Sequence, residues 1–179
     1  MNATPKYKSA VTFGRFNIPH KGHVELVAKM LQVADYAVVA VSGGAKNNDW
    51  DLRVLMFRAL LRRSNVDPSR VRFVNQANPF AAIDCAAQNA PFQETVLVLG
   101  EDQEAMAKQL SDACDVPFIL NVRSTSSTSV RENMDKVDSI FQDRYVARLA
   151  RVLRFEEVTR ESQAKARRGV RKAPQSQVA

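Results

Sequence analysis

The stretch that decides the fold runs from residue 10 to residue 23 and reads Ala10-Val11-Thr12-Phe13-Gly14-Arg15-Phe16-Asn17-Ile18-Pro19-His20-Lys21-Gly22-His23. Its first four residues are apolar or β-branched and predict a strand, which ends at a glycine. Apolar residues then return at helical spacing and predict a helix: Leu26, Val27, Met30 and Leu31. A strand that leads through a short loop into a helix is the first half of a βαβ unit.

The same alternation continues along the chain. Further strands are predicted at 36–41, 71–74, 95–99 and 117–120, and helical patterns separate them at 52–60, 80–89 and 104–113. Two more helices follow, one starting near Ser129 and one over 145–153. This pattern predicts a single Rossmann-like α/β domain over 1–158, with a five-stranded parallel sheet and helices on both faces. Ligands of such folds bind at the carboxyl ends of the strands.

The composition is that of an ordinary globular protein. The 179 residues are 45% hydrophobic and 25% charged. No apolar run is long enough for a membrane helix, and the first residues contain no apolar signal core. Cys85 and Cys114 are too few and too far apart for a disulfide framework or a structural zinc site. We therefore expect a cytoplasmic protein without a membrane partner.

Most of the positive charge lies at the end of the chain. The formal net charge is +7, and residues 160–179 contribute +5 of it. Few large apolar side chains are present there, so little would repay the entropy of ordering the segment. We expect 159–179 to be a basic, disordered tail whose removal leaves the fold intact. Contact with a polyanion is the alternative, and we do not expect nucleic acid to be a partner.

The loop between the first strand and the first helix has the chemistry of an anion site. His20 and His23 are three residues apart at a helix start, so they face the same way. Gly22 between them leaves room for a phosphate, and the helix start offers N–H groups and a positive dipole end. The alternative is that the histidines cap the helix or face water. Two histidines without a convincing third ligand do not predict a metal site.

Residues 14–23 resemble the H-x-G-H signature of the nucleotidylyltransferase superfamily, in the G-R-F-x-P-x-H-x-G-H form of nicotinamide mononucleotide adenylyltransferases. The resemblance implies that His20 and His23 contact the phosphates of a nucleoside triphosphate. It also implies that the backbone of Gly14, Arg15 and Phe16 lies along the nucleotide. One departure is Ile18, which stands where relatives have proline or other residues. This difference affects no polar contact of the motif.

A second segment, Ser126-Ser127-Thr128-Ser129-Val130-Arg131, resembles the I-S-S-T-x-x-R motif of the same superfamily, with Thr125 in place of isoleucine. The resemblance implies that the hydroxyl cluster of Ser126, Ser127 and Thr128 binds phosphates together with Arg131. By its spacing alone, Ser129-x-x-Glu132 is also a capping box.

The resemblance covers residues 9–135 and implies further contacts. Gly100 and Asp102 form a G-x-D segment that in the superfamily contacts the adenosine ribose, although Asp102 could equally cap a helix. On the acceptor side, Lys46 is a candidate or a solvated loop lysine. Trp50 could stack on a flat heterocycle or pack its helix onto the sheet. Arg53 reads as an exposed helix charge that could reach a phosphate.

The resemblance implies the transfer of AMP from ATP to a small phosphate-bearing acceptor, with Mg²⁺ bound to the triphosphate. The acceptor that we expect is nicotinamide mononucleotide, and the product is then NAD. Arg131 and the Gly14-Arg15-Phe16 start favour this branch over a phosphopantetheine adenylyltransferase or a cytidylyltransferase. The chain shows no Ser-His-Asp pattern or placed cysteine nucleophile. A non-catalytic nucleotide sensor or polyanion-binding protein is the alternative class. The sequence leaves open whether copies of the chain assemble.

Overall fold

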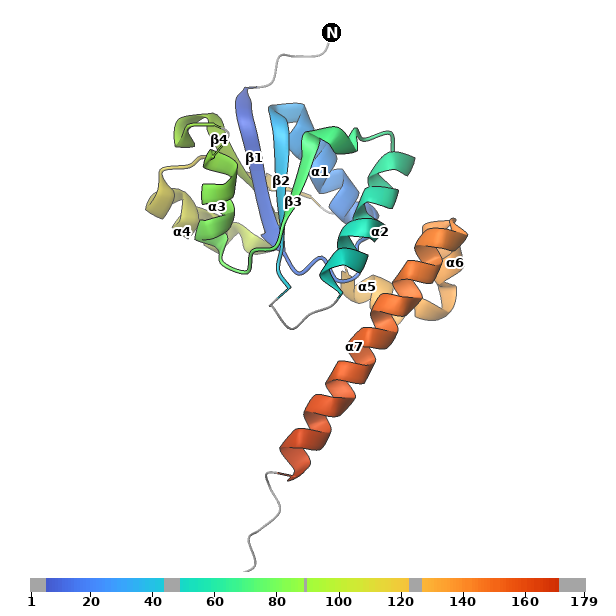
Figure 1. The fold of residues 1–179 in the computed structure, drawn as a ribbon. Coiled ribbons are helices and arrows are strands. Elements are labelled where there is room, and N and C mark those ends of the chain that lie inside the picture. Colours follow the sequence, from blue (N-terminus) through green and yellow to red (C-terminus); the bar gives the residue numbers. More distant parts are fainter. Residues whose placement is uncertain (1–5, 44–48, 89, 123–126, 171–179) are drawn as a thin grey trace, which may run out of the picture.

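The structure is a computed structural model that describes residues 6–43, 49–88, 90–122 and 127–170. Its centre is one sheet of five parallel strands in the order β3-β2-β1-β4-β5 (Figure 1). The strands are β1 (Tyr7–Gly14), β2 (Ala34–Val41), β3 (Val71–Val74), β4 (Thr95–Gly100) and β5 (Phe118–Asn121). The predicted α/β class and the five-stranded parallel sheet are confirmed.

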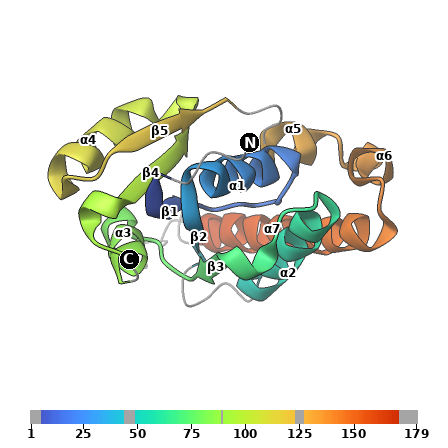
Figure 2. The ribbon, with the colours of Figure 1, turned by 90° about the horizontal axis from the view of Figure 1, so that it is seen from above.

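Helices cover both faces of the sheet, as the sequence predicted (Figure 2). Alternate strand residues point to opposite faces, so Val96 and Val98 pack on one side and Leu97 and Leu99 on the other. The first side is covered by α1 (Lys21–Val33) and α2 (Trp50–Arg63). The second is covered by α3 (Pro79–Ala87) and α4 (Glu104–Cys114).

A third apolar cluster joins the C-terminal helices to the body. It lies among α2, α5 (Ser127–Glu132), α6 (Val137–Phe141) and the first half of α7 (Arg144–Val170). Ile18, from the loop after β1, is fully buried in this cluster beside Met56, Val146 and Leu153. The position that departs from the family pattern therefore anchors the loop to the C-terminal helices.

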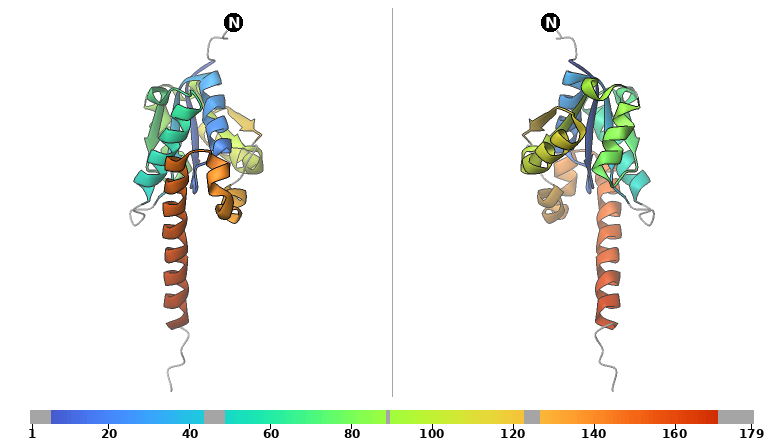
Figure 3. Two further views of the ribbon diagram at one scale, coloured as in Figure 1. Left: turned by 90° about the vertical axis from the view of Figure 1, so that its right-hand side faces the viewer. Right: turned by 90° about the vertical axis from the view of Figure 1, so that its left-hand side faces the viewer.

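The last helix is longer than the sequence led us to expect. α7 has 27 residues, and its second half projects away from the domain (Figure 3). The expectation of a disordered tail from residue 159 therefore does not hold for 159–170, where residues with good helix propensity extend a helix already anchored by buried residues such as Leu153. Residues 171–179 lie outside the described part. Neither α7 nor any other described helix is both long and apolar enough to cross a membrane.

Candidate nucleotide site

The loop after β1 lies where the order of the strands reverses, because β1 pairs with β2 on one side and with β4 on the other. At such a point the loops that follow the two central strands diverge and leave space for a ligand. The loop comprises residues 15–20 and ends at the first residue of α1. Both sequence signatures meet at this loop.

The two histidines cap the start of α1. The Nδ1 atom of His20, the N-cap residue, accepts the N–H of Gly22 at 3.1 Å. The Nδ1 atom of His23 accepts the N–H of His20 at 3.3 Å. The rings lie side by side, with centroids 3.8 Å apart and planes tilted by 31°. The capping alternative is therefore present in the structure.

These caps decide which nitrogen of each ring holds the proton. A nitrogen that accepts a backbone N–H has no proton of its own, so a neutral ring carries its proton on Nε2. In their neutral forms His20 and His23 thus each carry one N–H group, at Nε2. The pair is deeply placed, with only 1% and 4% of the two residues exposed. His20 also lines a cavity of about 530 Å³ beside Lys21 and Arg63.

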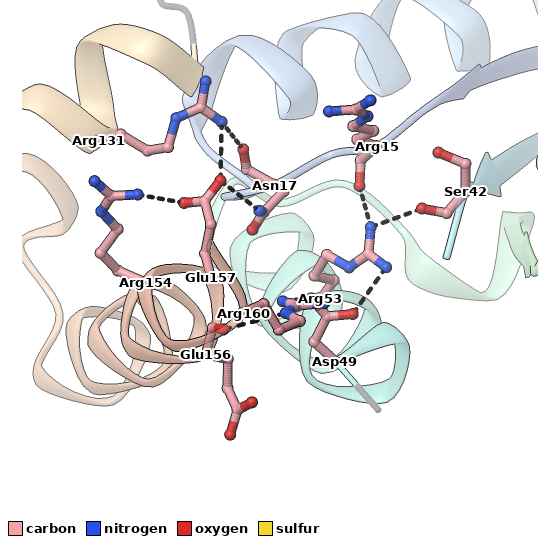
Figure 4. A network of polar contacts seen from close by, with 10 residues as sticks. All are labelled: Arg15, Asn17, Ser42, Asp49, Arg53, Arg131, Arg154, Glu156, Glu157 and Arg160. Atoms are coloured by element: carbon pink, nitrogen blue, oxygen red, sulfur yellow. Dashed lines mark hydrogen bonds and ion pairs between the residues drawn. The ribbon is translucent and has the colours of Figure 1, made fainter. Parts of the chain in front are cut away.

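The residues before the histidines have different tasks. Phe16 has a φ of 46° and is buried edge-on against His23, with ring centroids 4.9 Å apart. Its ring is thus a packing support for the histidine. A Cβ at Gly14 would lie 3.4 Å from the Phe16 ring, an ordinary contact, so the fold itself does not require glycine there. The Arg15 side chain is exposed and points away from the polar network of the loop (Figure 4).

The second signature reaches the same loop through Arg131. Its Nη1 donates to the Asn17 carbonyl oxygen at 2.8 Å. The predicted capping box at Ser129 is wrong, because α5 begins at Ser127 and places Ser129 inside the first turn. Ser127 and Thr128 open the helix, but their side chains, together with Ser126 and Lys46, lie outside what the structure describes.

Arg53 was expected to be exposed, and this is wrong: the residue is 2% exposed. Its guanidinium donates to the carbonyl oxygens of Arg15 and, at 3.0 Å, Ser42, and it pairs with Asp49 at 3.1 Å. Burial lowers the pKa of Arg53, while the Asp49 carboxylate raises it. A Cβ at Gly43 would lie 2.4 Å from Arg53 Nη2, so this glycine leaves room for the guanidinium.

The remaining predicted residues lie close to the sheet. Trp50 is the first residue of α2 and packs against the apolar cluster between the sheet, α1 and α2. Of the two roles considered for this residue, the structure shows packing of its helix onto the sheet. Gly100 ends β4. Asp102 lies in a short 3-10 turn, and the N-cap of α4 is Gln103, so the capping alternative for Asp102 is wrong. Gly22 is buried in the first turn of α1.

The sequence interpretation missed four residues of the polar network around this loop: Asn17, Asp49, Glu157 and Arg160. Glu157 and Arg160 lie on α7 and contact Asn17 and Asp49, respectively (Figure 4). They help to line a cavity of about 450 Å³ with Arg15, Asn17, Ser42, Asp49, Arg53, Ala77 and Glu161. No local motif marks these residues, because their partners are up to 140 positions away in the chain.

Among the described residues, no three His, Cys, Asp or Glu side chains gather as a metal site. A Rossmann-like sheet, with one phosphate-type signature after β1 and a second at the start of α5, defines the class of the protein as a nucleotidyltransferase. The chain belongs to the cytidylyltransferase-like family, whose model matches residues 11–139. The superfamily recognised in the sequence is thus confirmed, and α7 lies outside the match.

Two curated relatives are glycerol-3-phosphate cytidylyltransferases. The enzyme of Bacillus subtilis is 26% identical over 128 residues, which cover 71% of this chain and 97% of the relative. That of Staphylococcus aureus is 24% identical over 136 residues, which cover 71% and 95%.

Two similar solved structures are those of adenylyltransferases. A bifunctional NMN adenylyltransferase/ADP ribose pyrophosphatase from Francisella tularensis aligns with a TM-score of 0.64 at 17% identity, over 94% of this chain and 57% of its own. This chain therefore spans little more than half of that enzyme. A putative nicotinate-nucleotide adenylyltransferase from Vibrio parahaemolyticus aligns with a TM-score of 0.60 at 16% identity, over 80% of this chain and 91% of its own. These similarities support the shared fold.

Proposed function

We propose that the protein transfers a nucleotidyl group from a nucleoside triphosphate to a phosphate-bearing acceptor and releases pyrophosphate. The observation that carries the proposal is the histidine pair at the start of α1, whose rings are 3.8 Å apart and whose Nδ1 atoms are both occupied as caps. The pair lies at the amino end of α1, where backbone N–H groups and the helix dipole favour a phosphate. Arg131, which lies on α5 and donates to a carbonyl oxygen of this loop, adds a planar cation for the outer phosphates.

The chemistry fits such a site. An oxygen of the acceptor phosphate attacks the α-phosphorus, the bond from that phosphorus to the bridging oxygen breaks, and pyrophosphate leaves. The attacking phosphate is already ionised near neutral pH, so no base has to remove a proton. Alignment and charge neutralisation are the main requirements. The triphosphate binds as its Mg²⁺ complex, in which phosphate oxygens and waters are most of the ligands of the metal.

The donor and acceptor that we propose are ATP and nicotinamide mononucleotide, which would give NAD. The resemblance of Gly14-Arg15-Phe16 and of Arg131 to the adenylyltransferase form of the two signatures supports this choice. A second candidate is CTP with glycerol 3-phosphate, which the two curated relatives favour.

The test is pyrophosphate release by the full chain, with ATP or CTP in turn against five acceptors, with and without Mg²⁺. The acceptors are nicotinamide mononucleotide, nicotinate mononucleotide, glycerol 3-phosphate, phosphopantetheine and choline phosphate. The expected result is release with ATP and nicotinamide mononucleotide and a product of the mass of NAD. Release only with CTP and glycerol 3-phosphate would select the second candidate.

A matched control is the His23→Ala variant purified in the same way, whose activity should be lower by about 10²-fold. Equal activity in the two preparations would indicate a contaminating enzyme. Nucleotide binding without release for any pair would replace the enzyme proposal by a nucleotide-sensing role.

A further inference from the structure

The C-terminal helix α7 places two side chains against the candidate site, although it lies outside the family match at residues 11–139. Glu157 and Arg160 are three residues apart and therefore occupy one face of the helix. Each makes polar contacts with residues more than 100 positions away. The helix is thus joined to the site by charges in addition to the apolar cluster at its first half.

Glu157 joins the two signatures. Its carboxylate accepts the side-chain N–H of Asn17 at 3.2 Å and lies 3.8 Å from the Nη1 atom of Arg131. The same Nη1 donates to the Asn17 carbonyl oxygen. The Glu157 side chain is 18% exposed, so solvent screens these contacts only in part. One carboxylate therefore touches the loop after β1 and helix α5 together (Figure 4).

Arg160 is connected to the same loop through two intermediate residues, Asp49 and Arg53. Its Nη2 pairs with Asp49 Oδ2 at 2.5 Å, and Asp49 Oδ1 pairs with Arg53 at 3.1 Å. Arg53 then donates to the carbonyl oxygen of Arg15. Helix α7 is thus connected to this loop in two ways. Glu157 contacts Asn17 directly, and Arg160 is linked to Arg15 through Asp49 and Arg53.

We propose that Glu157 and Arg160 are positioning residues, which hold Arg131 and the loop at 15–17 in the geometry that binds the triphosphate. This inference rests on the proposed function. Glu157 pairs with Arg131 at 3.8 Å, and its shorter contact, at 2.7 Å, is with Arg154 on its own helix. Because the carboxylate is shared between two arginines, we expect Glu157 to position Arg131 and not to compete with the phosphates.

The central test is Glu157→Gln in the full chain. Glutamine keeps the length of the side chain and an oxygen acceptor for Asn17, but it removes the charge that faces Arg131. We expect the affinity for the Mg²⁺ complex of the triphosphate, measured by calorimetric titration, to fall between about tenfold and a hundredfold, and kcat/KM to fall with it. The melting temperature should stay close to that of the control variant.

The matched control is Glu156→Gln, which makes the same change one residue earlier, where the carboxylate points away from the network (Figure 4). Arg160→Gln should act in the same direction as Glu157→Gln, with Arg167→Gln, on the exposed part of α7, as its control. Both control variants should bind the triphosphate as the wild type does.

The outcomes separate the two proposals. Wild-type affinity and kcat/KM in Glu157→Gln would overturn the positioning role while leaving the function in place. Tighter binding in this variant would also overturn it, and would identify Glu157 as a competitor of the phosphates. Absence of pyrophosphate release by the wild type would instead overturn the proposed function, and the titrations would still decide whether Glu157 shapes a nucleotide site.

Discussion

At the scale of single residues, His20 caps α1, and in the proposed function it also contacts a phosphate; substitutions can separate these two tasks. Asparagine at position 20 can accept the Gly22 N–H as His20 Nδ1 does, but it lacks the Nε2–H. We expect His20→Asn and His20→Ala both to lower kcat/KM by about 10²-fold, since each loses one donor to the phosphates. Only the alanine variant should also lose the cap, and it should be less stable than the asparagine variant by about 1 kcal/mol.

Chemical denaturation and steady-state kinetics on the two variants measure both effects. If His20→Asn keeps wild-type turnover while His20→Ala loses only stability, the residue is a helix cap and takes no part in the reaction.

Arg131 supports a second prediction at this scale. Arg131 donates to the Asn17 carbonyl oxygen, and a guanidinium is a planar set of donors that can bridge two phosphate oxygens, whereas lysine is a point charge. Arg131→Lys should therefore lower kcat and kcat/KM together, by at least about tenfold, as expected for a contact made mainly in the transition state. Initial rates over a range of triphosphate concentrations measure both constants. Full kcat with reduced stability would make Arg131 a structural residue.

At the scale of elements, Arg53 fastens α2 to the ends of β1 and β2. The guanidinium has three oxygen partners while 2% exposed, and Asp49 beside it is 5% exposed. Arg53→Met keeps much of the volume but leaves buried acceptors without a donor. We expect a loss of about 3 kcal/mol in the free energy of unfolding, measured by denaturant titration.

The control for this prediction is Arg62→Met, which removes an exposed arginine from the same helix and should change stability by less than about 0.5 kcal/mol. Equal, small effects of the two substitutions would show that the buried network contributes little to stability.

At the scale of the whole molecule, the structure revises what truncation of the C-terminus should do. A chain that ends at residue 161 keeps Glu157 and Arg160 and loses the end of α7, of which residues 162–167 are exposed, and the residues after it. It should therefore melt like the full chain. A chain that ends at residue 159 loses the pair between Arg160 and Asp49, and its free energy of unfolding should fall by about 1–3 kcal/mol.

Thermal melts of the two truncated chains beside the full chain check this prediction. Identical melting temperatures for all three would restore the expectation from the sequence that everything after residue 159 is dispensable for the fold.

The sequence by itself determined the parts of the protein that local spacing encodes. Continuous apolar or β-branched runs at 10–13 and 36–41 predicted strands β1 and β2, because a strand buried on both faces must be apolar along its length. The spacing of His20 and His23 placed both rings on one side of a helix start. These features depend on residues a few positions apart, so they can be read before any packing is known.

Tertiary structure alone decided which charges are buried and what they hold. In the sequence, Arg53 is one arginine among several on a helix, and Glu157 follows the apolar positions of the last predicted helix, where no spacing indicates a partner. Their roles arise because α2 and α7 pack through apolar residues such as Met56 and Leu153, which carry the polar neighbours into the site. Burial of apolar surface is summed over the whole chain, and no local pattern states which distant segments it will bring together.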